Sequence, residues 1–126
     1  MFTPSEELIA AIANGEMVVI TDDENRENEG DLVMAAEKVT PEAINFMVTH
    51  GRGLVCAPLT QKRATELGLY EMARNEDPFG TMFTITVDAN QGTPTGISAF
   101  DRATTIRALA DPRTDARDLH APGHVF

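Results

Sequence analysis

The residues best suited to chemistry lie in one ten-residue stretch, Asp22–Asp31, directly after an apolar run. Its charged residues are Asp22, Asp23, Glu24, Arg26, Glu27, Glu29 and Asp31, which give a formal charge of −5 against −10 for the whole chain. Carboxylates at this density repel one another, and a divalent cation or an arginine among them relieves the repulsion. Mg²⁺ takes one or two carboxylates and completes its shell with water and substrate oxygens. The stretch therefore predicts a site for a hard cation.

Two other interpretations of this acidic stretch need to be weighed. A solvated surface loop also carries dense charge, and that interpretation stays open on composition alone. The neighbouring strand-like run Met17–Thr21 favours a functional loop, because catalytic groups are often carried on loops beyond strand ends. A calcium-binding EF-hand loop beginning at Asn25 would need a bidentate glutamate at its twelfth position, which is Ala36. The EF-hand is therefore excluded.

The length, charge and cysteine content of the whole chain limit the class of protein further. Its 126 residues suit one domain, spanning 1–126, with a single core. The net charge of −10 and a pI near 4.6 argue against nucleic acid or an anionic membrane as partner. No apolar run reaches membrane-spanning length, and no secretory signal is recognised. Cys56 is the only cysteine, which fits a reducing cytoplasm.

Four helices are expected to position these residues. Ser5 is the expected cap of the first, Thr40 of the second and Thr60 of the third, and Ser98 begins a capping-box-like start of the fourth. Ile44, Met47 and Val48 would form the core face of the second helix. The predicted ranges are 4–13, 40–51, 60–67 and 98–110.

Strands are expected between these helices. A continuous β-branched run predicts a buried strand over Met17–Thr21, and the period-two alternation of Thr81–Val87 gives the clearest strand signal. Leu32–Ala36 and Gly53–Ala57 are further candidates. Residues 71–80, the turn at 91–96 and the segment 111–126 carry no periodicity and are expected to be irregular. Strands and helices alternate, so the predicted class is α/β or α+β, with helices packed on a mixed twisted sheet.

Four segments, in order along the chain, resemble the 3,4-dihydroxy-2-butanone 4-phosphate synthase family of riboflavin biosynthesis. The resemblance rests on Asp22–Asp31, His50–Cys56, Thr95–Thr105 and Pro122–Phe126. The acidic stretch is highly specific, and three further motifs at suitable spacing support it. The resemblance implies the fold of that family and a lyase that converts D-ribulose 5-phosphate into formate and 3,4-dihydroxy-2-butanone 4-phosphate. It also implies Mg²⁺ or Mn²⁺ as cofactor and a cytoplasmic homodimer.

The resemblance also assigns roles by position. Glu27 matches the metal-binding glutamate and also a substrate-binding position. The other substrate-binding positions are Asp22, Arg26, Asp31, Thr95 and Asp101. Thr95 and Asp101 are expected to contact the substrate bound to the other subunit of the dimer. The catalytic positions are His124, Glu29 and Cys56. Read without the resemblance, Cys56 suits a small core hydrophobe, Asp101 a helix-start residue and His124 a surface residue.

The chemistry implied by the resemblance begins with removal of a proton from carbon 1 of the sugar, which gives an enediolate. A cation stabilises the enediolate oxygens, and crowded carboxylates and a histidine exchange protons near neutral pH. The family continues beyond Phe126, into a segment that supplies a second metal ligand and phosphate contacts. Two alternatives therefore stay open: a truncated, non-catalytic scaffold or dimerisation fragment of this fold, and an unrelated acidic cation-binding module.

Overall fold

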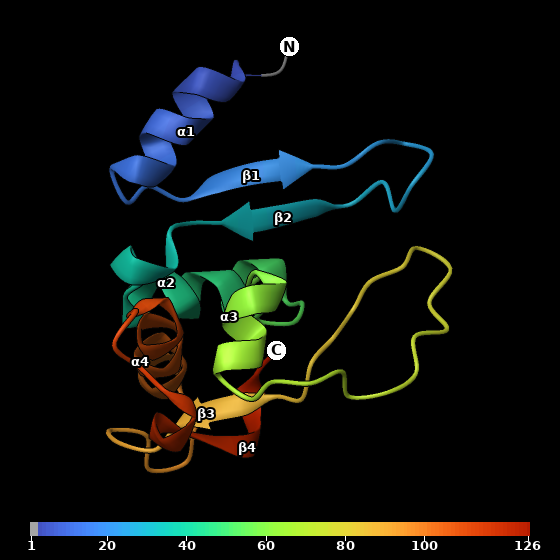
Figure 1. The fold of residues 1–126 in the computed structure, drawn as a ribbon. Coiled ribbons are helices and arrows are strands. Elements are labelled where there is room, and N and C mark those ends of the chain that lie inside the picture. The colour runs from blue at the N-terminus through green and yellow to red at the C-terminus, as the bar shows by residue number, and fades with distance from the viewer. Residues whose placement is uncertain (1–2) are drawn as a thin grey trace.

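The computed structural model describes residues 3–126 as an N-terminal helix and hairpin placed above a helical layer and a second small sheet (Figure 1). The helices are α1 (Ser5–Ala13), α2 (Pro41–Phe46), α3 (Gln61–Glu66) and α4 (Ala99–Ala110), and the strands are β1 (Val18–Thr21), β2 (Gly30–Val33), β3 (Val87–Ala89) and β4 (Leu119–Val125). Short 3₁₀ turns cover Ala36–Lys38 and Ala116–Asp118, and a π turn covers Met47–Gly51. No helix among the described residues is long and apolar enough to cross a lipid bilayer.

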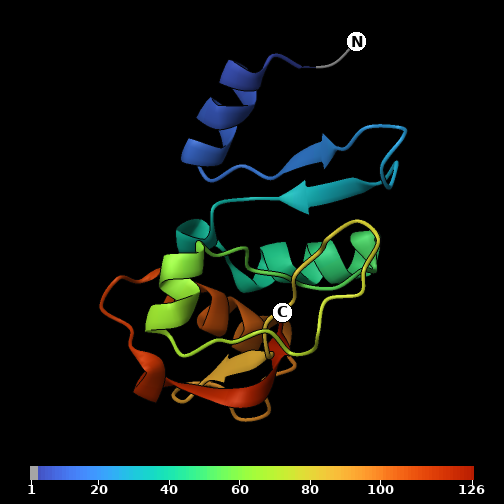
Figure 2. The ribbon, with the colours of Figure 1, turned by 45° about the vertical axis from the view of Figure 1, so that its right-hand side comes forward.

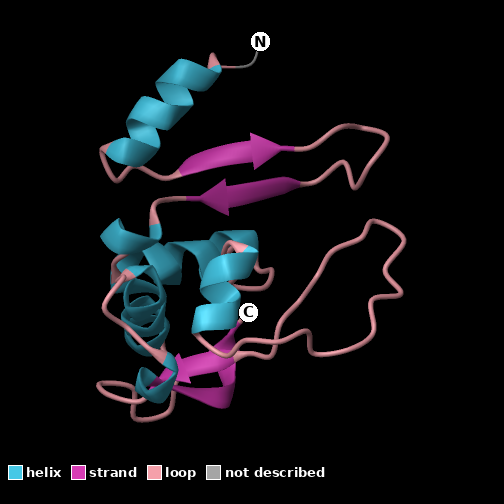
Figure 3. Cartoon of the chain, viewed as in Figure 1, coloured by secondary structure: helices cyan, strands magenta, loops and turns pink. Residues whose placement is uncertain are grey.

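The described strands form two separate antiparallel pairs, β1 with β2 and β3 with β4 (Figure 3). The α/β class is confirmed, but the single mixed sheet expected from the alternation of elements is not formed within this chain. The β3–β4 pair has an irregular register: Val87 faces Val125, whereas the next residue, Asp88, faces His120. This jump leaves residues 121–124 bulged out of the ladder.

Helix α4 is the centre of the core, packed against α2 on one side and against β3 and β4 on the other (Figure 2). Ala103, Ile106 and Leu109 of α4 are buried with Ile44 of α2 and Val125 of β4. Met47 and Val48 pack against this cluster from its edge, as predicted for that helical face. None of the buried residues of the described chain comes from the β1–β2 hairpin.

The predicted helices are confirmed, and their starts follow local rules. Thr40 accepts a hydrogen bond from the backbone of Ala43, Thr60 from Arg63, and Ser98 from Asp101. Each cap satisfies a helical N–H that has no partner within the helix. The expected cap at Ser5 is wrong, because Pro4 occupies the N-cap of α1 and no side chain caps it.

The strand predictions are less accurate. β1 forms as expected but is not buried, since Val19 is 60% and Ile20 43% exposed. The second strand begins earlier, at Gly30, and ends at Val33, after which the alanines turn into a 3₁₀ helix. Gly53–Ala57 forms no strand, although Val55 and Ala57 exchange backbone hydrogen bonds with Phe126.

The two largest errors lie at the second sheet. Thr81–Val87 is mostly irregular, with a single bridge from Thr84 to Glu71, and the strand covers only Val87–Ala89. Conversely, Leu119–Val125 is a strand in a segment that was expected to be irregular. Its Ala121-Pro122-Gly123 sequence is typical of a turn, and here it forms the bulge of β4.

Candidate functional site

The acidic stretch is the loop that joins β1 to β2, and the Asp22 carboxylate organises it. Asp22 accepts hydrogen bonds from the backbone N–H groups of Glu27 (2.9 Å) and Glu29 (2.8 Å), and from Arg26 Nη1 (3.1 Å). The two backbone hydrogen bonds, followed by the arginine, lower the pKa of Asp22. Asp22 is thus a structural residue of the loop, with both carboxylate oxygens committed to loop donors.

Arg26 reduces the charge repulsion within the loop. Its Nη1 lies 3.1 Å from both Asp22 Oδ2 and Glu27 Oε2, and these two contacts raise its pKa, the Asp22 hydrogen bond more than the Glu27 charge. Its guanidinium carbon also lies 6.0 Å from the centre of the Phe79 ring. Phe79 belongs to the exposed loop 71–80, which lies beside the hairpin loop in both views (Figures 1 and 2).

The exposed acidic side chains of the loop are the candidate cation ligands. Glu27 is partly exposed, with its Oε2 bonded to Arg26, and Glu29 is exposed. Within residues 3–126, no group of three or more histidine, cysteine, aspartate or glutamate side chains is arranged to hold a metal ion. Carboxylate oxygens in water suit Mg²⁺, which needs only one or two protein ligands. Glu27 is one of the exposed loop carboxylates that could provide such a ligand.

Asp31 and Cys56 form a second part of the candidate site. Asp31 lies on β2 opposite Ile20, and Cys56 follows buried Val55 on an extended segment. Packing around the Cys56 thiol raises its pKa, and the negative charge of Asp31 raises it further. The thiol therefore stays protonated at neutral pH, which suits a polar contact and not a thiolate nucleophile.

The third part is centred on His124, near the end of β4. Its Nδ1 lies 2.7 Å from Asp88 Oδ2, and its backbone N–H donates to Asp88 Oδ1 (2.9 Å). Asp88 is only 2% exposed, whereas the side chain of His124 is 39% exposed. The imidazole is thus hydrogen-bonded to a buried carboxylate through Nδ1, and its side chain is partly exposed to solvent. His124 is not a free surface histidine.

Thr95 and Asp101 are linked to this histidine through Gly96, which lies beside His124 and donates its N–H to Asp101. The buried Asp101 carboxylate accepts hydrogen bonds from the Gly96 N–H (2.9 Å), the Thr95 N–H (3.3 Å) and the Thr95 hydroxyl (3.2 Å). Burial by itself raises the pKa of Asp101, but the hydrogen bonds, first that of Gly96, outweigh it and the net shift is downward. Asp101 therefore fixes the turn before α4. Its side chain does not complete the reciprocal arm of the predicted capping box.

The three parts are connected through the backbone. The N–H of Phe126 donates to Val55 O (3.1 Å), and its carbonyl accepts from Ala57 N–H (2.8 Å), so the segment carrying Cys56 lies beside the end of β4. Gly96 contacts both Asp88 and His124. The structure thus links Thr95 and Asp101 to His124 through Gly96, and it places Cys56 where the charge of Asp31 acts on its thiol. Asp22, Arg26, Glu27 and Glu29 stay in the exposed hairpin loop.

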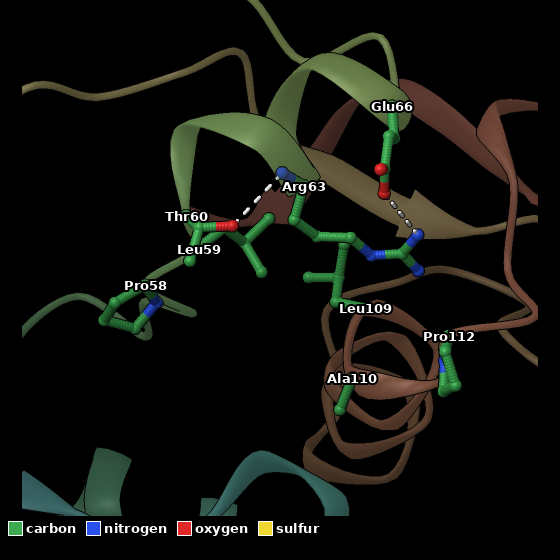
Figure 4. Close-up of a pocket in the computed structure, with 8 residues that line it drawn as sticks. All are labelled: Pro58, Leu59, Thr60, Arg63, Glu66, Leu109, Ala110 and Pro112. Carbon is green, nitrogen blue, oxygen red and sulfur yellow. Dashed lines mark hydrogen bonds and ion pairs between the residues drawn. The ribbon is translucent and has the colours of Figure 1, made fainter.

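Two hollows in the described part of the chain are lined by no predicted site residue. One, of about 400 Å³, lies between α3 and the end of α4, where Arg63 pairs with Glu66 above Leu109 (Figure 4). Arg63 also donates to the carbonyls of Asp111 and Thr114, so it is committed to joining the two helices. The other hollow, of about 180 Å³, lies between α3 and β4. Neither hollow is lined by residues of the acidic loop or by His124.

Asp88 is a residue of the candidate site that the sequence interpretation missed. The predicted strand ended one residue earlier, at Val87. The available signal was a lone carboxylate inside an apolar run, Val87-Asp88-Ala89, where an unpaired charge would be costly. Such a residue implies a buried partner, and the partner here lies 36 residues further along the chain.

Comparison with known proteins places these residues in a family. The sequence model of 3,4-dihydroxy-2-butanone 4-phosphate synthase matches residues 6–126. The chain is 55% identical over 122 residues to a protein of that name from Pseudomonas aeruginosa, covering 96% of this chain and 33% of that protein. It is 51% identical to the Candida albicans protein of the same name, covering 100% of this chain and 62% of that one.

Longer proteins and solved structures support the same family assignment. The chain is 55% identical to the riboflavin biosynthesis protein RibBA of Aquifex aeolicus, covering 99% of this chain and 32% of that protein. A structure of 3,4-dihydroxy-2-butanone 4-phosphate synthase in complex with two magnesium ions superposes with a TM-score of 0.96 at 51% identity, over 99% of this chain and 59% of that one. This chain therefore spans between a third and three fifths of these relatives, and it belongs to the 3,4-dihydroxy-2-butanone 4-phosphate synthase family.

Proposed function

We propose that this chain carries part of the active site of a lyase that converts D-ribulose 5-phosphate into 3,4-dihydroxy-2-butanone 4-phosphate and formate. The observation that carries the proposal is the identity of about half the residues, over nearly the whole chain, with proteins named for making that product. Membership of this family sets aside the unrelated cation-binding module. We extend to this chain a place in riboflavin biosynthesis, as named for its RibBA relative.

The residues of the chain suit the separate demands of this reaction. Arg26 and Asp31 would contact the sugar hydroxyls, while Thr95 would approach from the turn before α4 and Asp101 from the first turn of α4. His124, with Nδ1 facing Asp88, has Nε2 available to accept or donate a proton on the sugar carbons and oxygens. Glu29 is an exposed carboxylate near Glu27 that can exchange protons, and the protonated Cys56 thiol is a polar contact.

Glu27 is the proposed metal ligand of this chain, with Mg²⁺, or alternatively Mn²⁺, as the ion. When bound, the ion supplies Lewis acidity toward the oxygens of the sugar. A structural relative described as a complex with two magnesium ions supports this assignment, and the partly exposed Glu27 carboxylate is compatible with it. We also propose a cytoplasmic homodimer, in which Thr95 and Asp101 reach the substrate bound to the partner subunit.

The test measures formate released from D-ribulose 5-phosphate and Mg²⁺ by the natural protein that carries this chain. We expect Glu27→Gln to lower the rate by roughly 10²-fold or more, since the change removes a metal ligand. Glu24→Gln is the matched control: it removes a neighbouring exposed carboxylate of the same loop that is outside the proposed site. Equal rates for the wild type and Glu27→Gln would contradict the assignment.

A second function, a non-catalytic scaffold or dimerisation fragment, is favoured by one observation. Among residues 3–126, no cluster of three metal-ligating side chains is found. Calorimetric titration of the 126-residue chain with Mg²⁺ and D-ribulose 5-phosphate separates the two functions. Saturable heat supports a binding site within this chain, and its absence together with a stable dimer supports the scaffold.

A further inference from the structure

His120 is a titratable residue beside the candidate site to which the proposed function assigns no role. It lies on β4 ahead of His124, and the irregular register of the second sheet places it opposite Asp88. Its Nε2 lies 4.0 Å from Asp88 Oδ2, the same oxygen that His124 Nδ1 contacts at 2.7 Å. The side chain of His120 is 52% exposed, so the ring exchanges protons with solvent. One buried carboxylate oxygen therefore has two imidazoles beside it.

Asn90 determines which nitrogen of His120 carries a proton. The amide nitrogen of Asn90 donates to the carbonyls of Arg117 and Leu119, so its amide oxygen is the atom that faces His120 Nδ1, at 2.9 Å. A carbonyl oxygen only accepts hydrogen bonds, and Nδ1 must therefore be the donor. The backbone N–H of Asn90 also donates to the carbonyl of Asp118 (2.8 Å), which keeps Asn90 beside the start of β4. The nitrogen of His120 that is left to face Asp88 is Nε2.

The charge on the His120 ring decides how Nε2 interacts with Asp88. In the neutral ring, Nε2 is an acceptor that faces another acceptor, so the two atoms do not attract each other. In the protonated ring, Nε2–H brings a positive charge to 4.0 Å from the carboxylate. Asp88 is only 2% exposed, and water screens such a carboxylate less than one on the surface. His120 therefore becomes a partner of Asp88 only when it is protonated.

Other charged groups near His120 do not take this role within residues 3–126. The acidic residues of the neighbouring elements lie beyond ion-pair distance from His120: Glu66 on α3, Asp101 on α4, and Asp115 and Asp118 before β4. The basic residues of the same elements do not donate to Asp88: Lys62, Arg63, Arg102, Arg107 and Arg117. The other residues that line the hollow between α3 and β4, where His120 also lies, carry no charge. Asp88 is thus the carboxylate on which a charged His120 acts.

We propose that His120, once protonated, shares the charge of Asp88 with His124 and so keeps His124 able to accept a proton at lower pH. Both imidazoles draw on the same carboxylate oxygen, so a positive charge on one opposes a positive charge on the other. His120 is then a positioning residue that acts through Asp88, and Asn90 is the residue that aims its ring. The inference rests on the proposed function only in that His124 then acts in the lyase reaction.

The first measurement follows the titration of the His124 ring by NMR, in the natural protein that carries this chain. We expect the midpoint of the His124 titration to rise by about 0.5 pH unit in His120→Asn, because the variant removes the neighbouring positive charge. His50→Asn is the matched control, since His50 is an exposed histidine that lies against Phe46, and it should leave this midpoint unchanged. Loss of the signals in His124→Gln assigns the ring. An unchanged or lower midpoint in His120→Asn overturns the proposal.

The role of Asn90 has its own test. In Asn90→Ala the ring of His120 loses the acceptor of its Nδ1 proton, so Nε2 is no longer held toward Asp88. We expect the His124 midpoint to rise as in His120→Asn, but by less. Nitrogen-15 NMR of the neutral His120 ring should report an Nδ1–H tautomer in the wild type. An Nε2–H tautomer there overturns the proposal, and this measurement decides even if Asn90→Ala does not fold.

Formate release from D-ribulose 5-phosphate provides the readout in the reaction. The rate falls on the acid side as the proton acceptor becomes protonated, and we expect His120→Asn to shift this fall to higher pH by about 0.5 unit. Above neutral pH the rate should change little, because His120 is then uncharged in the wild type as well. A uniform loss of rate at every pH would indicate a purely structural role and overturn the proposal. A His124 midpoint that responds to His120→Asn, in a protein that releases no formate, supports the coupling and contradicts only the lyase.

Discussion

The carboxylates of this chain occupy two contrasting regions, the exposed β1–β2 loop and the interior around α4 and β3. In the loop, Asp22 and its neighbours are held by loop N–H groups and by Arg26, and the other side chains face water. In the interior, Asp88 and Asp101 are each less than 5% exposed, and one holds a histidine while the other holds a turn. The loop concentrates charge on exposed side chains, whereas the interior uses single buried carboxylates to hold neighbouring groups in place.

The largest effect is expected from Gly96→Ala in the interior. A methyl group there meets Asp88 and His124 at distances that cannot be accommodated, and the positive φ adds strain. We expect a loss of about 2–4 kcal/mol in the free energy of unfolding. Gly92→Ala is the matched control, because Gly92 also has a positive φ but its Cβ would meet Thr104 at an ordinary 3.6 Å. It should cost only about 1 kcal/mol, and equal losses in chemical denaturation would show that the interior is less tightly packed than described.

A smaller effect is expected from Asp101→Asn, and it should depend on pH. The pKa of Asp101 is lowered in the folded chain, so its ionised form stabilises the fold above the usual pKa of an unfolded aspartate, about 3.9. That contribution is lost as the pH falls through the lowered folded value. We expect the wild type to melt at a higher temperature than Asp101→Asn at pH 7, with the difference closing below about pH 4.

The corresponding variant in the exposed β1–β2 loop is Asp22→Asn. Asp22 also has a lowered pKa, so Asp22→Asn should show the same sign of pH dependence. Its partners lie within an exposed loop, and the core does not rest on them. We therefore expect a smaller shift in melting temperature than for Asp101→Asn. A larger shift for Asp22→Asn would reverse the contrast between the two regions.

The smallest effect is expected from Glu27→Gln on the stability of the metal-free chain. The change removes one ion pair with Arg26 and one of several repelling charges, and exposed pairs contribute little. We expect the free energy of unfolding to stay within about 0.5 kcal/mol of the wild type. Thermal denaturation without divalent cations checks this. A clear loss of stability would mean that Glu27 organises the loop in place of serving a ligand.

Helices were predictable from the sequence because their signals are local. Thr40, Thr60 and Ser98 each bond to a backbone group three residues ahead, and no distant residue is needed. The exposure of β1 was not predictable in this way, since an apolar run indicates a strand but not what covers it. β4 was missed because its partner strand is far away and its proline and glycine lie in a bulge.

In the candidate site, too, local features were predictable from the sequence and long-range contacts were not. The acidic loop and the Pro122–Phe126 motif were recognised as a resemblance in the sequence, and the family is confirmed. The pairing of Asp88 with His124 depends on the register jump in β3–β4, which brings together residues 36 positions apart. The link from Cys56 to β4 depends likewise on two backbone hydrogen bonds of Phe126. Sequence patterns supplied the candidate site residues, whereas the residues that contact them from distant parts of the chain are defined only by the tertiary structure.

The contact between Arg26 and the Phe79 ring has a practical consequence. The chain contains no tryptophan and one tyrosine, so an indole introduced as Phe79→Trp would be its dominant fluorophore. Its emission would depend on whether the guanidinium stays beside the ring or turns to a newly arrived sugar phosphate. If the acidic hairpin binds a sugar phosphate as proposed, the same contact offers an optical signal for its occupancy, which can be followed in real time and without a coupled assay.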